Sequence, residues 1–299
     1  MRQFRNERQY EAIRQCSEER GYPIETLCQI LHVSRAGYYQ WHAGKLSPRA
    51  AENKRIAEQV EEIHGASPDK GYRRIRDDLA RYYDTSVNDK RVRRICQSLG
   101  IKSTIKYARH SCTRSVSDPK HTAENILNRQ FHADRPNEKW LTDVTEFKYY
   151  IGPVVHKVYL SAILDLYDRR IVAAVIRDAN DCALVYETLD KAMTDNPDAH
   201  PLFHSDRGFQ YTTQVFRDKL AAAGMTQSMS RVGKCIDNGP MEGFWGILKR
   251  ERYYGRRFTS REELVWMIED YIAYYNSRRL QRGLGVLTPF EKHELAMAA

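Results

Sequence analysis

The sequence predicts an α/β domain built on a mixed five-stranded sheet with helices, preceded by all-α helix-turn-helix domains. Helical periodicity dominates the chain up to residue 105, whereas short β-branched and aromatic runs alternate with helical stretches after Glu138. The charge balance also changes along the chain: residues 1–120 contain 24 Lys and Arg and 15 Asp and Glu, and residues 121–299 contain 24 of each. A length of 299 residues and a hydrophobic content of 41% are sufficient for more than one core.

The composition narrows the class of protein. A basic first part fits a module that binds a polyanion such as nucleic acid, and the alternative is a basic surface exposed to water. The six cysteines form no C-x-x-C pair, and His110 and Cys112 are interpreted as loop residues, so we expect free thiols in a reducing compartment. No apolar run approaches the ~20 residues of a membrane span, and the charged N-terminus lacks a signal-peptide core. These features predict a cytoplasmic protein without a membrane partner.

Residues 1–48 are predicted to form the first helix-turn-helix domain. After a polar helix, apolar side chains recur at helical spacing over residues 24–31, and Ser34 is a good N-cap for a second short helix. Two short helices joined by a tight turn make a helix-turn-helix. Arg35 and Tyr38 on the second helix are the predicted DNA contacts, and the alternative is a small helical hairpin with its aromatic residues in the core.

Residues 49–105 are predicted to form a second helix-turn-helix domain. Helical periodicity begins at Asn53, continues over residues 72–82, and ends in a helix that Asn88 caps and Gly100 stops. This last helix has an apolar side and a basic side, as a helix that contacts DNA phosphates does. The alternative is a basic face exposed to water. The predicted DNA contacts on it are Lys90, Arg91, Arg93 and Arg94.

Residues 106–136 lose periodicity and are predicted to be a linker with a helical piece near Ala123–Arg129. Residues 137–255 form the predicted catalytic core, and residues 256–299 a C-terminal helical extension whose helix starts with a capping box at Ser260. The core elements follow the order three strands, helix, strand, helix, strand, helix, which is the order of ribonuclease H-like folds. The strands are expected at residues 140–147, 154–166, 170–176, 202–205 and 226–229, and the helices at residues 182–193, 212–223 and 240–251.

Three acidic residues lie in or beside these elements. Asp143 lies in the first strand, Asp206 follows the fourth, and Glu242 sits just inside a helix that opens with a proline, with 35 residues between the last two. In the predicted fold they meet at one edge of the sheet, where they would repel one another, so a divalent cation is the natural partner. We therefore predict that Asp143, Asp206 and Glu242 are the catalytic residues and hold two Mg²⁺ or Mn²⁺ ions.

Such a site would perform phosphoryl transfer. One ion activates a water or a DNA 3′-hydroxyl for in-line attack on a phosphodiester, and the other stabilises the leaving 3′-oxygen, so no covalent enzyme–DNA intermediate is needed. Lys249, seven residues after Glu242 on the same predicted helix face, is expected to contact the DNA backbone. Other polar residues nearby are predicted to have structural roles. Asp165 and Asp168 are expected in a turn between two strands, paired with arginine, and Asp237 and Asn238 are expected to cap a helix.

The motifs around these residues resemble those of retroviral integrases and of bacterial insertion-sequence transposases of the "IS three" kind, the OrfB protein. The resemblance covers about residues 50–295. It is carried by the 35-residue gap, the runs 204–211 and 237–242, and a C-terminal signature made of residues 275–276, Arg279, residues 284–285 and residues 288–289. The chain departs from the family at Gln281, where a His is usual, and at Gly243, where a Ser is common. The resemblance adds four supporting residues to the site: His204, Asn238, Asn276 and Arg279.

The resemblance implies a DDE transposase with endonuclease and polynucleotidyl-transferase activity. Such an enzyme binds the terminal inverted repeats of an insertion sequence and its target DNA, cleaves strands at the ends of the element and transfers them. The resemblance also implies a homo-multimer on DNA, a bacterial, nucleoid-associated location and an upstream OrfA partner. The OrfB frame is often fused to OrfA by frameshifting, and no heptad run is visible here, so the chain is either the downstream half or a self-sufficient variant. The alternatives are a catalytically inactive DNA-binding regulator and a metal-dependent nuclease without strand transfer.

Overall fold

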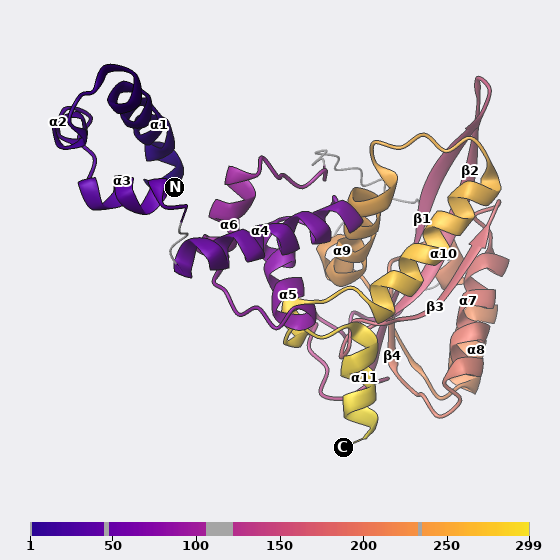
Figure 1. The fold of residues 1–299 in the computed structure, drawn as a ribbon. Helices are drawn as coiled ribbons and strands as arrows, with labels where there is room; N and C mark the ends of the chain where they lie inside the picture. The colour runs from indigo at the N-terminus through magenta and orange to yellow at the C-terminus, as the bar shows by residue number, and fades with distance from the viewer. Residues whose placement is uncertain (1, 45–47, 106–121, 233–234, 299) are drawn as a thin grey trace. The chain divides into compact units, whose positions relative to one another are not determined.

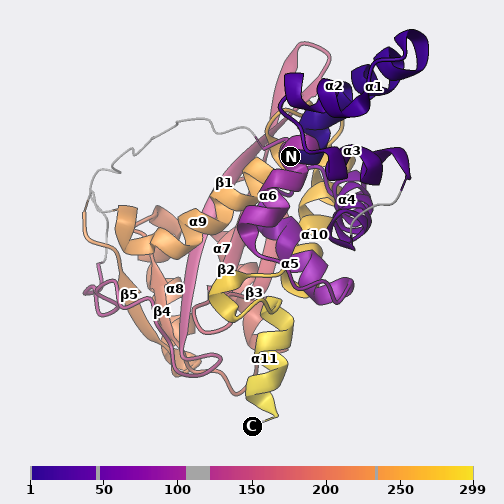
Figure 2. The same ribbon diagram turned by 60° about the vertical axis from the view of Figure 1, so that its left-hand side comes forward.

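Two units make up the chain in the computed structural model, Met1–Thr104 and Ile105–Ala299, and each is described by itself. The structure describes residues 2–44, 48–105, 122–232 and 235–298 (Figures 1 and 2). His110 and Cys112 therefore lie outside the described residues. The finer five-part division expected from the sequence stays a prediction. Within the described ranges, no helix is long and apolar enough to cross a membrane.

The first unit begins with three helices, α1 (Arg2–Arg20), α2 (Ile24–Ile30) and α3 (Arg35–His42). The predicted cap of α3 is present, because the Ser34 hydroxyl accepts a hydrogen bond from the Gly37 N–H at 3.1 Å. α2 and α3 are thus two short helices joined by a turn, as expected. Their small buried core consists of Tyr10, Ile13, Cys28 and Tyr38.

Three further helices follow, α4 (Pro48–Ala66), α5 (Tyr72–Tyr82) and α6 (Asp89–Ser98). The predicted cap of α6 is also present, since the Asn88 side chain accepts the Arg91 N–H at 2.8 Å. Apolar residues recur at helical spacing on one face of each helix, and these faces bury one another. The shared core consists of Ile56, Val60, Ile63, Ile75, Leu79, Val92, Ile95 and Cys96.

The second unit is built on a five-stranded sheet whose strand order is β3-β2-β1-β4-β5. β1, β2 and β3 pair antiparallel, whereas β4 pairs parallel to β1 and β5 parallel to β4. The predicted mixed sheet is confirmed, and β1 is its central strand. The strands are β1 (Lys139–Ile151), β2 (Val154–Asp165), β3 (Ile171–Arg177), β4 (Leu202–Ser205) and β5 (Thr226–Met229).

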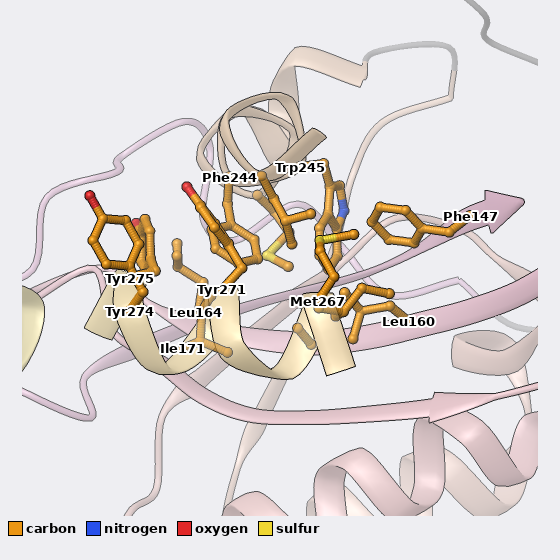
Figure 3. Close-up of a cluster of buried hydrophobic side chains, with 14 of the residues drawn as sticks. Phe147, Leu160, Leu164, Ile171, Phe244, Trp245, Met267, Tyr271, Tyr274 and Tyr275 are labelled. Atoms are coloured by element: carbon orange, nitrogen blue, oxygen red, sulfur yellow. The ribbon is translucent and has the colours of Figure 1, made fainter. Parts of the chain in front are cut away.

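Helices cover both faces of this sheet (Figure 1). α7 and α8 pack on one face through side chains such as Leu189 and Phe216, and α9 and α10 pack on the other through Phe244 and Tyr271 (Figure 3). Side chains alternate along a strand, so the face of each residue on β1 follows from its position. The helices are α7 (Cys182–Asp195), α8 (Gln214–Ala222), α9 (Gly239–Leu248), α10 (Arg261–Ser277) and α11 (Pro289–Met297).

Two local predictions are wrong. The segment Ala123–Arg129 contains no helix and packs in an irregular conformation, with the Leu127 N–H donating to the Ser228 hydroxyl at 3.1 Å and the Leu127 side chain buried. The helix expected to run to Glu251 ends at Leu248 and continues as a π-helical turn, Lys249–Tyr253. Both differences arise from contacts with distant parts of the chain, which local periodicity does not report.

Candidate active site

β1 places Asp143 on the face of the sheet that α9 covers. Successive side chains of a strand point to opposite faces, and Asp143 shares its face with Leu141 and Phe147, which lie in the core under α9 and α10. The Asp143 carboxylate accepts the Trp245 indole N–H at 3.0 Å and the Val144 backbone N–H at 2.8 Å. Asp143 is therefore a partly buried carboxylate fixed between β1 and α9.

The parallel pairing of β1 with β4 brings Asp206 next to Asp143. In the register of these strands Leu141 lies opposite His204, so two residues further along each chain Asp206 reaches the level of Asp143. The chain turns after β4, and the Asp206 carboxylate accepts the Gly208 N–H at 2.8 Å. A Cβ on Gly208 would approach the Asp206 Oδ1 to 3.0 Å, so this tight turn favours glycine.

α9 brings Glu242 toward Asp143, because residues before and after Glu242 form hydrogen bonds with β1. The Asn238 side-chain amide donates to the Thr142 carbonyl at 2.9 Å, one residue before Asp143. Trp245, whose indole reaches Asp143, lies three residues after Glu242 and on the same side of the helix. The exposed Glu242 side chain thus lies between two anchors that hold α9 against β1.

These carboxylates alter one another's charge. Burial raises the pKa of Asp143 to about 7, and the negative charges of Asp206 and Glu242 act in the same direction, against the two N–H bonds that Asp143 accepts. Burial also raises the pKa of Asp206. Among the described residues, no Lys or Arg forms an ion pair with Asp143 or Asp206. A bound divalent cation would relieve this unfavourable arrangement of charge.

The chemistry of the side chains fits a hard divalent cation. All three offer carboxylate oxygens, and an oxygen that accepts one N–H bond keeps a second lone pair for a ligand bond. Throughout the described ranges, however, no group of three Asp, Glu, His or Cys side chains is close enough together to hold a metal ion.

Lys249 lies beside the same strand. Its ammonium donates to the Thr145 hydroxyl at 2.6 Å and lies 5.0 Å from the centroid of the Phe147 ring, close along β1 to Asp143. Burial lowers the pKa of Lys249, and the charges of Asp143 and Glu146 oppose this effect. The contact of Lys249 with DNA stays a prediction.

Comparison with known proteins assigns this architecture. Two integrase core domain models match residues 133–235 and 242–295, and an HTH-like domain model matches residues 51–109. Over 274 residues the chain is 38% identical to transposase InsK for insertion sequence element IS150 of Escherichia coli K12, an alignment that covers 90% of this chain and 93% of the relative. The chain belongs to the insertion-sequence transposase family. The family resemblance expected from the sequence is confirmed.

One further relative and one solved structure are also similar to this transposase chain. It is 28% identical over 285 residues to transposase InsF for insertion sequence IS3fB of Escherichia coli K12, covering 92% of this chain and 96% of the relative. Among solved structures it is similar to the HTLV-2 integrase catalytic core domain in complex with magnesium, with 16% identity and a TM-score of 0.42, covering 54% of this chain and 99% of that one.

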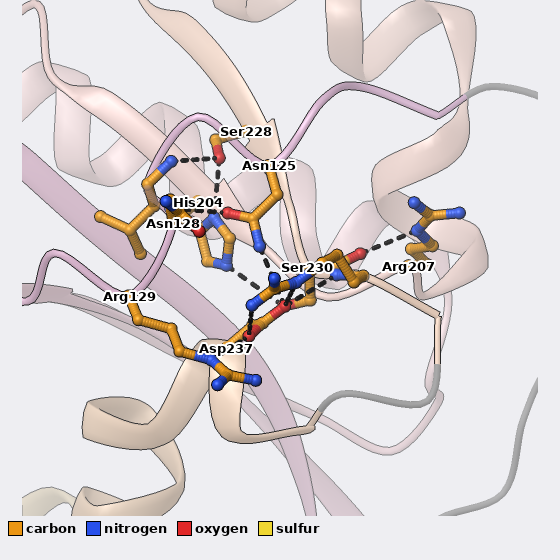
Figure 4. A network of polar contacts seen from close by, with 10 residues as sticks. Asn125, Asn128, Arg129, His204, Arg207, Ser228, Ser230 and Asp237 are labelled. Atoms are coloured by element: carbon orange, nitrogen blue, oxygen red, sulfur yellow. Dashed lines mark hydrogen bonds and ion pairs between the residues drawn. The ribbon is translucent and has the colours of Figure 1, made fainter.

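In this transposase chain His204, predicted to support the site, joins β4 to the chain at and just after β5 (Figure 4). Its ring lies between the Ser228 hydroxyl at 2.9 Å and the Ser230 hydroxyl at 3.1 Å, and it is fully buried. Burial lowers the pKa of His204 to about 4, so the ring is neutral at pH 7. His204 therefore holds β4, and with it the turn that carries Asp206, against β5.

Asn238 occupies the N-cap position of α9, as predicted, but its side chain makes no capping hydrogen bond, and the Asp237 side chain contacts other residues. The buried Asp237 carboxylate accepts hydrogen bonds from Arg231 at 2.8 and 2.9 Å and from Arg129 at 2.6 Å (Figure 4). Hydrogen bonds from Arg231, reinforced by those from Arg129, hold the pKa of Asp237 well below its usual range. Asn238 makes no capping bond and reaches β1 instead. Both residues fix the segment that leads into Glu242.

The two C-terminal residues predicted to support the site, Asn276 and Arg279, connect elements that are far apart in the sequence. The Asn276 amide accepts the Ile171 N–H at 2.9 Å and donates to the Ile171 carbonyl at 3.0 Å, which fastens α10 to the start of β3. The Arg279 guanidinium binds both oxygens of Glu251, at 2.8 and 3.1 Å, in the π-helical turn after α9. Their described contacts are with α10, β3 and this turn.

The DNA contacts predicted in the first unit differ in exposure. Tyr38 is only 2% exposed and belongs to the core of α1, α2 and α3, so the prediction that it contacts DNA is wrong. Arg35 is exposed and forms an ion pair with Glu25 at 3.1 Å. On α6, Arg91 is engaged by Glu52 at 2.8 Å. Of the contacts predicted on α6, the side chains of Lys90, Arg93 and Arg94 are exposed.

Asp165 and Asp168 form the predicted turn between β2 and β3. Asp165 accepts the Tyr167 N–H at 2.7 Å, and Asp168 accepts the Arg170 N–H at 2.8 Å. The partner of the second Asp168 oxygen is His293 of α11 at 2.7 Å, which takes the place of the arginine that was expected.

The two departures from the family pattern meet at one cavity. Gln281 and Gly243 both line a cavity of about 250 Å³, together with Arg169, Phe244 and Tyr275. Gly243 lies one residue after Glu242, and a Cβ there would meet no atom within 4 Å. A larger residue would therefore fit at position 243 without a clash.

Sequence reasoning missed Trp245 and the Arg129–Asp237–Arg231 cluster. Trp245 was visible as the aromatic residue three positions after Glu242, a spacing that places both on one helical face. The arginines offered no such signal, because 108 positions separate Arg129 from Asp237. Only the packing of the segment before β1 against the segment before α9 brings them together.

Proposed function

We propose that this transposase binds the ends of an insertion sequence and catalyses metal-dependent DNA cleavage and strand transfer at Asp143, Asp206 and Glu242. The observation that carries the proposal is the convergence of these residues from β1, the end of β4 and α9, where Asp206 and Glu242 both raise the pKa of Asp143. Membership of the insertion-sequence transposase family supports DNA as the substrate.

In this proposal the carboxylates hold two Mg²⁺ or Mn²⁺ ions, which supply Lewis-acid activation of the attacking and leaving oxygens when bound. The protein orients these ligands. The N–H groups of Val144 and Trp245 fix the Asp143 carboxylate, and the Gly208 N–H fixes that of Asp206. These hydrogen bonds would keep the metal-binding carboxylates in a defined orientation before DNA binds.

The reaction is a displacement at phosphorus. A water oxygen in cleavage, or a DNA 3′-hydroxyl oxygen in transfer, forms a new P–O bond while the bond to the leaving 3′-oxygen breaks. In transfer one phosphodiester is exchanged for another, so no external energy source is needed. Lys249, whose ammonium donates to Thr145 two residues along β1 from Asp143, would contact the phosphate backbone of the bound DNA strand.

DNA is held mainly by the first unit in this proposal. Exposed Arg35 on α3 and the exposed basic side of α6 would contact phosphates of the terminal inverted repeats, which makes binding sensitive to salt. Target DNA would bind at the catalytic unit. Pairing of two element ends requires a homo-multimer, and OrfA is the proposed upstream partner.

A strand-transfer assay tests the proposal. The full chain is incubated with Mg²⁺ and a labelled duplex that carries the element's terminal repeat with a free 3′-hydroxyl, beside an unlabelled target. Joined products with wild type and none with D143N are expected. Cleavage without joined products would identify a nuclease instead, and DNA binding without either product would identify a regulator.

A further inference from the structure

The π-helical turn Lys249–Tyr253 is held from two sides. On the side of β1, the Lys249 ammonium donates to Thr145, and the Tyr253 hydroxyl accepts the Lys148 N–H at 2.9 Å and donates to the Lys148 carbonyl at 3.1 Å. One side chain thus occupies both backbone groups of a residue on the catalytic strand. These hydrogen bonds fix the position of the turn relative to β1.

On its other side the turn is held by the C-terminal segment. The Glu251 side chain, only 4% exposed, accepts the Tyr271 hydroxyl at 2.9 Å and both arms of the Arg279 guanidinium at 2.8 and 3.1 Å. The Arg279 side chain is 13% exposed. Bidentate pairing between nearly buried partners fixes geometry more tightly than a surface ion pair does.

A π-helical turn needs such support. The Tyr254 N–H reaches the Lys249 carbonyl at 2.7 Å, five residues back, and this spacing is rare and often found at functional sites. Relaxing the turn to an α-helix would rotate every later side chain relative to α9. A buried glutamate between an arginine and a tyrosine resists this change, because an unpaired charge would remain in the interior.

From these contacts we propose that Glu251, Arg279 and Tyr271 form a brace whose role is to position Lys249 on a DNA phosphate beside Asp143. Arg279 and Glu251 are positioning residues, acting through the turn, and Lys249 is the residue that touches DNA. The inference rests on the proposed function, since it assigns the DNA backbone as the partner of Lys249. It gives the C-terminal signature residue Arg279 a task in substrate binding.

The test is the dependence of DNA affinity on salt concentration, measured with the full chain. K249Q is expected to lower the slope of log affinity against log salt by about 1, the change for one lost phosphate contact. R279Q is expected to lower the slope by the same amount, and the double variant R279Q/K249Q by no more than either alone. R279K, which keeps the charge, is expected to restore part of the slope.

R261Q is the matched control, because Arg261, the first residue of α10, forms an ion pair with exposed Asp178 and not with Glu251. It should leave the slope unchanged. If R279Q cannot be purified, Y271F with K249Q gives the same cycle with a smaller expected effect. The inference is overturned if R279Q lowers the melting temperature but not the slope, or if its effect adds to that of K249Q.

A K249Q variant with an unchanged slope would also overturn the inference, because Lys249 would then contact no phosphate. That result leaves the proposed reaction intact, since strand transfer by wild type and its loss in D143N are measured separately. Failure of the brace and failure of the proposed function are thereby distinguished.

Discussion

Asp237 with its arginine partners, and the three acids Asp143, Asp206 and Glu242, are two sets of side chains with opposite electrostatics. Asp237 is buried among Arg231, Arg129 and Asn125, and its pKa is held well below the usual range. Asp143, which shares its site with Asp206 and Glu242, has a pKa raised to about 7. The charge of Asp237 is compensated within the protein, whereas no Lys or Arg in the described part of the chain forms an ion pair with Asp143 or Asp206. A structural acid and a candidate metal ligand are thus distinguished by their neighbours.

The largest expected difference between the two sets is in activity. D143N should reduce strand transfer at least about a thousandfold, equivalent to ~4 kcal/mol, because the metal-binding charge is lost while the shape is kept. D237N should retain activity in proportion to the folded fraction. Strand transfer per folded molecule, measured at a temperature where both variants are folded, checks this. Equal losses in the two variants would remove the distinction.

Metal binding should separate the sets next. Mg²⁺ at a hundred times its dissociation constant should raise the free energy of unfolding of wild type by about 2.7 kcal/mol. D206N should lose this stabilisation, because a ligand is removed, and D237N should keep it. Thermal unfolding with Mg²⁺ or EDTA measures the effect. An equal response of wild type and D206N would exclude the carboxylates as the ion's ligands.

Without metal, D237N should be the less stable of the two variants D237N and D143N. D237N should lower the free energy of unfolding by about 2 kcal/mol, because Arg231 and Arg129 lose a buried partner, although both remain partly exposed to water. D143N should be neutral or stabilising, because it removes one of several mutually repelling charges. Denaturant unfolding in EDTA compares the two. Destabilisation by D143N as large as that by D237N would contradict this.

The fold was predictable from the sequence because it depends on local signals, and the roles of the three acids stay a prediction. β-branched and aromatic runs predicted the strands, with Asp143 inside the first strand, Asp206 just after the fourth and Glu242 just inside a helix. What failed depends on tertiary contacts. Tyr38 is on the predicted helix, but its burial is decided by packing against α1. Asn238 is a residue type that commonly caps helices, yet its side-chain amide donates to the Thr142 carbonyl on β1, 96 positions away in the chain.

The smallest expected difference is in the dependence of stability on pH without metal. The pKa of Asp143 is raised in the folded state, so its protonation favours folding: this contribution is complete below pH ~4 and is lost as the pH rises toward about 7. The pKa of Asp237 is lowered, so its contribution is present at neutral pH and is lost only as the pH falls below ~4. The two sets therefore act in separate pH windows and with opposite signs.

Wild type should therefore lose about 1 kcal/mol more than D143N between pH 5 and pH 7 in EDTA, a modest value because Asp143 keeps some contact with water. D237N should follow the wild-type pH dependence across this interval at a lower stability. Denaturant unfolding at each pH measures these curves. Parallel curves for wild type and D143N would mean that Asp143 is ionised throughout this range. Its repulsion with Asp206 and Glu242 would then be compensated inside the protein, as the charge of Asp237 is.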